Sequence, residues 1–274
     1  MRLASLIMAA AVALLQASAP ATPPQQQGRP VERISLDYTL RVFAIPFGHM
    51  DYAAAFAGSR YTAEMHFRTS GLAAVLWKSK IDASAEGRVG ADGLLLPGVY
   101  TTQSLSRHGT QQWVRVVYGG TGGPVMTAVP PYNLSRFRVT EAQKKGAVDP
   151  LTAIGAIVGG LNVPDAQPCG RALAVFDGRR RYDIVFSLVR AEGAGAANAR
   201  VCRAEYRQIA GIRQEVVDVT NVPAIYAEFV NVPAGTRHYT VARTIWSSFL
   251  WGAVSARLTE AQVDGRPIAV AFAP

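Results

Sequence analysis

The sequence predicts a mainly β protein: an antiparallel curved sheet, or a partly open β-barrel or half-barrel, with one short helix and one disulfide. Three observations support this fold class. Apolar runs of strand length follow one another along the chain, separated by turn residues such as Asp-Gly. A single stretch carries apolar residues at helical spacing. The two cysteines of the chain bracket its clearest hairpin.

The N-terminal residues have the pattern of a secretory signal. A basic start and an apolar stretch to Leu15 precede the small residues of a cleavage site, Ala17 to Ala21. We therefore expect residues 1–21 to be a cleaved signal peptide, with an uncleaved anchor as the alternative. Residues 22–32, rich in Pro and Gln, are expected to be a disordered leader. Residues 33–274 then form a single β-rich domain, exported to a bacterial periplasm and not membrane-spanning after cleavage.

The first half of this domain alternates apolar and polar residues in the manner of half-buried antiparallel strands. Ile34 to Val42 is the clearest case, because Leu36, Tyr38 and Leu40 share one face. Further strands are expected at 50–56, 61–69, 72–87, 95–106 and 111–118, with turns at Pro46-Phe47-Gly48, Ala57-Gly58, Asp92-Gly93 and Arg107-His108-Gly109.

A helix is predicted to begin at Asp149-Pro150 and to end at Gly159-Gly160. Asp accepts hydrogen bonds from the free amides of a helix start, and Pro suits the first helical position. Apolar residues then recur at helical spacing from Leu151 to Val158. This helix could cover one open face of the sheet or close one of its mouths.

The hairpin between the cysteines consists of two apolar runs joined at Asp177-Gly178, where a tight turn needs a residue that tolerates positive φ. In an exported chain, two lone cysteines usually pair, so we expect a Cys169–Cys202 disulfide. A zinc site is not favoured, because no His or third Cys lies nearby. The remaining strands are expected at 202–209, 239–251, 257–259 and 268–272, the last two around a turn at Asp264-Gly265.

The chain is basic, with 28 Lys and Arg against 19 Asp and Glu. A basic surface favours anionic partners such as lipid headgroups or other envelope components, although scattered charge is also ordinary for a soluble protein. The densest cationic group, Arg179, Arg180 and Arg181, is a candidate anion contact, with a solvated hairpin tip as the alternative. Nucleic acid is not an expected partner, because no recognition motif is found.

A search for chemistry gives no catalytic motif: the sequence has neither a G-x-S-x-G elbow nor an H-E-x-x-H pair. We therefore predict no catalytic residue, metal or cofactor. The histidines are dispersed and are interpreted as surface or rim residues: His49, His66, His108 and His238. The tryptophans are candidates to line an apolar pocket, with ordinary core packing as the alternative: Trp77, Trp113, Trp246 and Trp251.

Several short motifs occur in a characteristic order. They are Tyr38-Thr39-Leu40 leading to Ile45-Pro46-Phe47-Gly48, then Asp149-Pro150-Leu151, Phe176 to Arg180, and Cys202 followed by Tyr206 and Gly211. In this order, over roughly residues 34 to 260, they resemble the bacterial family called domain of unknown function 3108. The resemblance implies an exported, β-rich protein of Gram-negative bacteria with no assigned activity. It also implies an architecture similar to lipoprotein-localisation carriers, in which a half-barrel wraps a helix and offers an apolar cavity.

Three functions follow as hypotheses. The first is a non-catalytic periplasmic protein that holds a lipid or another amphiphile in the concave face of the sheet. The second is a structural or protein-interaction component of the cell envelope that uses surface patches or sheet edges. The third is a hydrolase of an envelope polymer, which would require a histidine or carboxylate with partners in a cleft.

Overall fold

The computed structural model describes residues 31–71, 74, 78–105, 109–119, 123–133, 138–158, 168–192, 199–211, 223–234, 237–249 and 252–270. The helices among them are α2 (Glu141–Lys144) and α3 (Pro150–Val158). The strands are β1 (Glu32–Val42), β2 (Ile45–Ala57), β3 (Arg60–Thr69), β4 (Lys80–Val89), β5 (Leu95–Leu105), β6 (Gln111–Val117), β7 (Val125–Val129), β8 (Ala172–Phe176), β9 (Arg181–Glu192), β10 (Ala199–Ala210), β11 (Ile225–Ala234), β12 (Arg237–Phe249), β13 (Gly252–Val263) and β14 (Arg266–Pro267).

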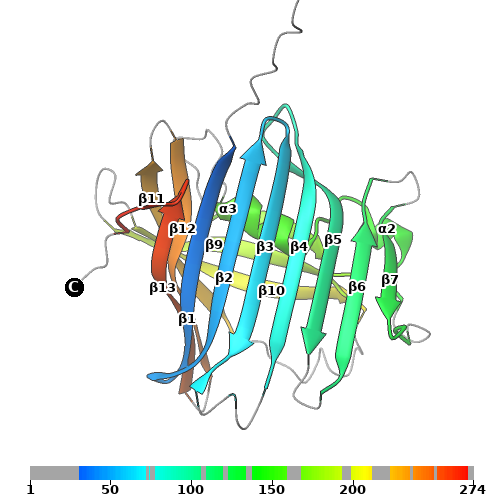
Figure 1. Cartoon of the computed structure of the whole chain (residues 1–274), viewed down its shortest axis with the longest axis horizontal. Helices are drawn as coiled ribbons and strands as arrows, with labels where there is room; N and C mark the ends of the chain where they lie inside the picture. Colours follow the sequence, from blue (N-terminus) through cyan, green and yellow to red (C-terminus); the bar gives the residue numbers. More distant parts are fainter. Residues whose placement is uncertain are drawn as a thin grey trace, which may run out of the picture.

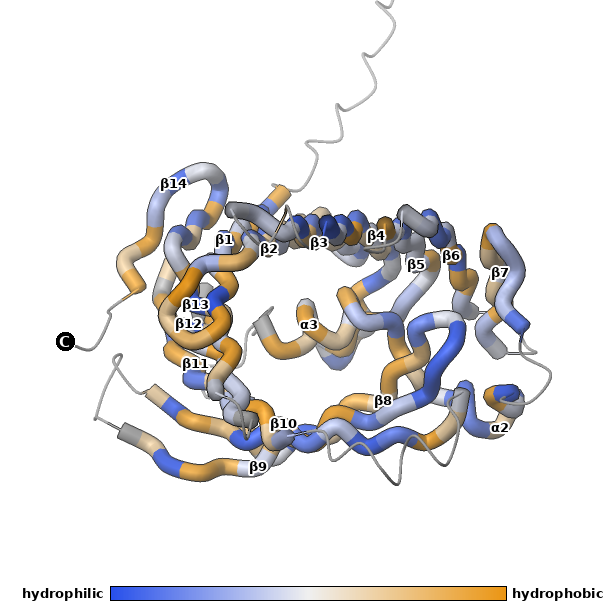
Figure 2. Tube along the Cα trace, turned by 90° about the horizontal axis from the view of Figure 1, so that it is seen from below, coloured by the Kyte–Doolittle hydropathy of each residue, from blue (hydrophilic) through white to orange (hydrophobic). Residues whose placement is uncertain are grey.

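These strands form one 14-stranded antiparallel sheet in the order β7-β6-β5-β4-β3-β2-β1-β13-β12-β11-β10-β9-β8, with β14 paired to β13. Consecutive strands are adjacent in the sheet, except for β7 and β8, which end the order, and the two halves are joined where β1 pairs with β13 (Figure 1). The sheet curls so that β2–β6 face β8–β10 across the interior, while β11–β13 form a side wall (Figure 2). The order of the described strands ends at β7 and β8, which confirms the predicted open, curved antiparallel sheet.

The gap between the two ends of the sheet is bridged by α2 and by side chains. The Nε atom of Arg181 on β9 donates to the carbonyl of Gln143 in α2 at 2.9 Å. The hydroxyl of Tyr118, which follows β6, donates to the carbonyl of Phe176 on β8 at 2.6 Å. Our sequence analysis predicted a single helix and missed α2, although Thr140 and Gln143 form the reciprocal capping box that marks a helix start.

Helix α3 lies inside the curled sheet, between its two layers (Figure 2). It begins where the sequence predicts, because Asp149 accepts a hydrogen bond from the amide of Thr152 at 2.8 Å. Toward its other end, the guanidinium of Arg171 donates to the carbonyl of Ala156 at 2.9 Å. A side chain that precedes β8 thus satisfies a helix carbonyl and joins α3 to the lower layer.

Turns with a local chemical signal were predicted correctly. Gly93, Gly178 and Gly265 all take positive φ between paired strands. The turn predicted at Pro46-Phe47-Gly48 is wrong, because these residues lie within β2 and the chain reverses at Phe43 and Ala44. Phe43 has a φ of 56°, a conformation usually taken by Gly, so the sequence carries no turn signal there.

The strand predicted at 72–87 begins later than expected. Gly71 and Ala74 are helical, and β4 begins only at Lys80. The predicted strand at 257–259 is part of the much longer β13, which pairs with β1 over most of its length.

Candidate functional site

The buried apolar side chains form two separate clusters. The larger lies under the N-terminal strands and contains Leu36 and Tyr52, while the smaller surrounds the disulfide and contains Phe186. Helix α3 contacts both, because Ile154 packs against the larger cluster and Ile157 against the smaller. The core is therefore divided, and α3 lies at the division.

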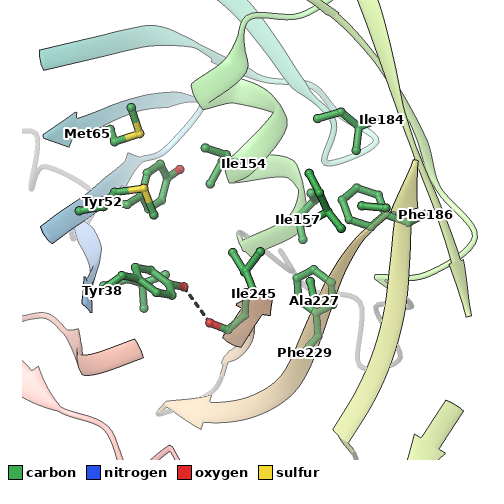
Figure 3. Close-up of a pocket in the computed structure, with 15 residues that line it drawn as sticks. Tyr38, Tyr52, Met65, Ile154, Ile157, Ile184, Phe186, Ala227, Phe229 and Ile245 are labelled. Atoms are coloured by element: carbon green, nitrogen blue, oxygen red, sulfur yellow. Dashed lines mark hydrogen bonds between the residues drawn. The ribbon is translucent and has the colours of Figure 1, made fainter. Parts of the chain in front are cut away.

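A cavity of about 230 Å³ occupies the space between the two clusters. Side chains from β1–β3, from β9–β12 and from α3 meet around it (Figure 3). The lining consists of apolar residues and two tyrosines: Leu36, Tyr38, Met50, Tyr52, Met65, Ile154, Ile157, Ile184, Phe186, Ala204, Ile225, Ala227, Phe229, Ala242 and Ile245. No charged side chain is among these lining residues of the described chain.

Much of this lining is not fully covered by neighbouring protein atoms. The methionines and isoleucines are only half-buried, whereas core residues of this kind are usually fully buried: Met50, Met65, Ile154, Ile157, Ile184, Ile225 and Ile245. Apolar surface removed from water stabilises by about 25 cal/mol per Å². Binding of a ligand that covers these side chains would therefore be favoured, because it removes their remaining apolar surface from water.

Three alanines supply the space for the cavity. Ala204, Ala227 and Ala242 lie at inward-facing positions of β10, β11 and β12, and each is buried. Small side chains at inward positions of three adjacent strands leave a hollow that larger residues would fill. These alanines are a sequence signal for the cavity, which we did not use when predicting its lining.

The two lining tyrosines differ in their hydrogen bonding. The hydroxyl of Tyr38 donates to the carbonyl of Ala242 at 2.9 Å. The hydroxyl of Tyr52 is buried and has no hydrogen-bond partner among the described residues. It points toward α3 beside Ile154 (Figure 3), close enough to Gly155 that a Cβ there would lie 3.1 Å away. Burial, with Asp149 nearby, strongly raises the pKa of Tyr52. A neutral hydroxyl thus remains unpaired at the wall of the cavity, which is rare for a buried polar group.

A second buried polar group nearby, the carboxylate of Asp149, has hydrogen-bond partners within the protein. The carboxylate of Asp149 accepts hydrogen bonds from the amide and hydroxyl of Thr152, and the hydroxyls of Thr152 and Tyr61 lie 2.5 Å apart. Burial raises the pKa of Asp149 above its ordinary value, against the opposing effect of the hydrogen bonds from Thr152. This chain ties the start of α3 to β3 and does not line the cavity.

The predicted disulfide is present between Cys169 and Cys202, and both residues are buried in the smaller cluster. Of the tryptophans that we proposed as pocket-lining residues, two lie among the described residues, and neither lines the cavity. Trp113 and Trp246 are not among the side chains around the cavity, and Trp246 stacks on Tyr226 with ring centroids 5.6 Å apart. Trp77 and Trp251 lie outside the described residues.

The arginines of the candidate anion contact do not converge. Arg181 is buried and pairs with Asp183 at 2.6 Å, in addition to its contact with α2. Arg180 pairs with Asp177 at 3.2 Å. The guanidinium of Arg179 lies 5.3 Å from the ring centre of Tyr132, as in a cation–π contact. Anion binding by this group stays a prediction.

The histidines whose side chains are described, His49 and His66, are exposed and lie on the neighbouring strands β2 and β3. His66 contacts Asp82 at 2.8 Å on the exposed face, and Lys80 contacts the same carboxylate at 2.7 Å. Lys80 first, and His66 second, lower the pKa of Asp82. His108 lies outside the described residues. Within the described part of the chain, no three His, Cys, Asp or Glu residues gather closely enough to hold a metal ion, and no helix is long and apolar enough to cross a membrane.

Comparison with known proteins does not identify a family for this chain. No family model and no curated protein matches the chain, so the resemblance to domain of unknown function 3108 is not confirmed. Among solved structures, the chain is similar to a "Beta-barrel-like Protein of Domain of Unknown Function DUF1849 from Brucella abortus". That match has 12% identity and a TM-score of 0.48, and it covers 85% of this chain and 97% of the other.

Proposed function

We propose that this protein is a non-catalytic periplasmic binding protein that holds a single-chain amphiphile in the cavity beside α3. The observation that supports this proposal most directly is a cavity of about 230 Å³, lined by apolar side chains, next to a buried and unpartnered tyrosine hydroxyl. The signal-like N-terminus and the disulfide support the proposed location, because disulfides persist in oxidising compartments.

The size of the cavity limits the ligand. An engineered apolar cavity of about 150 Å³ stays dry and binds benzene, whereas pockets for drug-sized ligands measure about 300–1,000 Å³. A volume of about 230 Å³ lies between these and suits one short acyl chain better than a whole phospholipid. The hydroxyl of Tyr52 can donate or accept a hydrogen bond, so the polar end of the ligand is a carboxylate, an ester or a hydroxyl.

Native mass spectrometry of mature protein from a periplasmic extract, followed by lipid analysis after denaturation, tests this function. We expect a stoichiometric amphiphile that is lost in Ala227→Leu, since a larger side chain there fills the cavity. Ala53→Leu is the matched control, because Ala53 lies on β2 but does not line the cavity. If the protein carries no lipid and binds no member of a series of straight-chain fatty acids, the proposal is wrong and a structural role in the envelope is favoured.

A second variant tests how the ligand is oriented. Tyr52→Phe removes only the unpartnered hydroxyl, so the ligand-free protein should be no less stable. Affinity for a fatty acid should fall about tenfold, because a hydrogen bond to the headgroup is lost. Equal affinity of both proteins, measured by titration calorimetry, would show that Tyr52 does not contact the headgroup.

A further inference from the structure

One end of the sheet displays a group of apolar side chains to solvent. Val42, Phe43 and Ile45, at the tip of the β1–β2 hairpin, are 38%, 62% and 67% exposed. We call these three residues the apolar tip. They lie together at the turn between β1 and β2, at the lower left of Figure 1, where Val42 is paired with Ile45.

The backbone of Phe43 has an unfavourable conformation that the surrounding contacts hold in place. Its φ of 56° is unfavourable for a bulky side chain, and Gly is the residue usually found in that conformation. The ring lies directly over Gly252 at the start of β13, where a Cβ would come within 2.0 Å of a ring carbon. The amide of Phe43 donates to the carbonyl of Ala253 at 2.7 Å. A strained aromatic residue that is anchored and still exposed is the kind of local conflict that marks a functional surface.

Exposed basic side chains lie to one side of the apolar tip, toward β3 and β4. The strand register places Arg68 opposite His49 and Lys80 opposite Arg68, so both lie toward the same end of the sheet as the tip. Arg68, Lys78 and Lys80 are exposed, and we call them the basic flank. Asp82 pairs with Lys80 and His66, so Arg68 and Lys78 supply the remaining positive charge of the flank.

The opposite end of the same layer provides a control. Leu94, between β4 and β5, is 62% exposed like Phe43. The amide of Leu94 donates to the carboxylate of Asp92 at 3.1 Å. Exposed arginines also lie toward this end, because Arg88 is opposite Leu96 and Arg60 is opposite Arg88, so Leu94 is a control for exposure in a similarly basic surround.

We propose that the apolar tip inserts into an anionic phospholipid surface while the basic flank contacts the lipid phosphates. Amphipathic surfaces of this type combine apolar side chains that enter the headgroup region with Lys and Arg that attract anionic lipids. A second copy of the chain is a weaker candidate occupant, because three side chains fall far short of the ~800 Å² per partner buried by a stable interface. The proposal does not depend on the cavity, although the same hairpin carries Tyr38 and Met50 into it.

Flotation with vesicles of equimolar phosphatidylcholine and phosphatidylglycerol tests the proposal with the full mature protein. We expect binding that weakens at high salt, since screening reduces the contribution of the basic flank. Ile45→Asp should lower the partition coefficient about tenfold or more, because one apolar side chain no longer enters the lipid. Leu94→Asp, the control with similar exposure, should bind like the parent protein.

Two further variants separate binding from folding. Phe43→Gly suits the local backbone, so it should fold normally and yet lose vesicle binding. Arg68→Glu combined with Lys78→Glu should lose the preference for anionic over pure phosphatidylcholine vesicles. The proposal is overturned if Phe43→Gly floats like the parent, or if Leu94→Asp is as defective as Ile45→Asp. It is also overturned if sedimentation shows a dimer that Ile45→Asp dissociates, since the tip then binds a second copy.

Discussion

The hydroxyl of Tyr38 donates a 2.9 Å hydrogen bond to the carbonyl oxygen of Ala242, which lies 204 positions further along the chain (Figure 3). Tyr38 is on β1 and Ala242 is on β12, and β13 lies between these strands in the sheet order. The β12–β13 ladder extends only to Thr244, so Ala242 lies just beyond its end. A side chain thus supports the cavity wall where the backbone ladder has stopped.

Tyr38→Phe should lower the free energy of unfolding by about 1–2 kcal/mol, because it leaves a buried carbonyl without its donor. Urea unfolding followed by circular dichroism measures this. Tyr239→Phe is the matched control, since the hydroxyl of Tyr239 is equally buried but has no partner among the described residues. Equal losses in both variants would contradict the role that we assign to the Tyr38 hydrogen bond.

Replacing both Cys169 and Cys202 by Ala should lower the free energy of unfolding by about 3–4 kcal/mol, the loop-closure contribution for a separation of 33 residues. The effect is measured by urea unfolding with and without reductant. Reductant should destabilise the parent protein and leave the double variant unchanged. A parent protein that is insensitive to reductant would show that the disulfide adds nothing to stability.

Gly178→Ala should destabilise the protein by about 2 kcal/mol or more. Gly178 has a φ of 94°, and a Cβ there would lie 2.8 Å from Val114 and 3.0 Å from Val116 on β6. The β8–β9 turn could then no longer pack against the other end of the sheet. Gly93→Ala measures the effect of backbone strain without a steric clash, because Gly93 has a φ of 79° with open space around it. Thermal unfolding should therefore show a smaller loss for Gly93→Ala than for Gly178→Ala.

Asp149→Asn should change how stability depends on pH. Burial raises the native pKa of Asp149 above 3.8, so between 3.8 and the native pKa the folded protein holds a proton that the unfolded chain has released. This contribution is present at low pH and is lost as the pH rises through that window. Asn keeps an acceptor for the helix start but does not titrate. The stability of the variant relative to the parent should thus increase with pH and then level off, as measured by urea unfolding across the pH range. A pH-independent difference would contradict this account.

The sequence predicted the parts of the fold that depend on neighbouring residues. The Asp177-Gly178 turn and the start of α3 at Asp149 both follow from local backbone chemistry, and both are confirmed. The reversal at Phe43 was missed because a bulky residue occupies a position that normally requires Gly. Strand register outside the hairpins, such as the pairing of β1 with β13, is decided by packing between distant segments and has no local signal.

The cavity was harder to predict, because it depends on which strand faces meet across the interior. We proposed tryptophans as its lining on the general ground that aromatic residues dominate β cores. Among the described residues, isoleucines and methionines line the cavity and alanines leave the space, and neither Trp113 nor Trp246 is part of the lining. The volume arises from the separation of two core clusters, which a one-dimensional pattern does not encode.

The position of β1 in the sheet also determines when the chain can finish folding. The amide of Arg33, on β1, donates to the carboxylate of Asp264, which is 231 positions later. One edge of β1 therefore has no partner until β13 has been synthesised and has paired with it. Closing so long a loop is slow. Until then, β1 presents an unpaired edge that can associate with other chains. Truncation before Gly252 should thus yield aggregates, because it removes the whole of the strand that covers this edge.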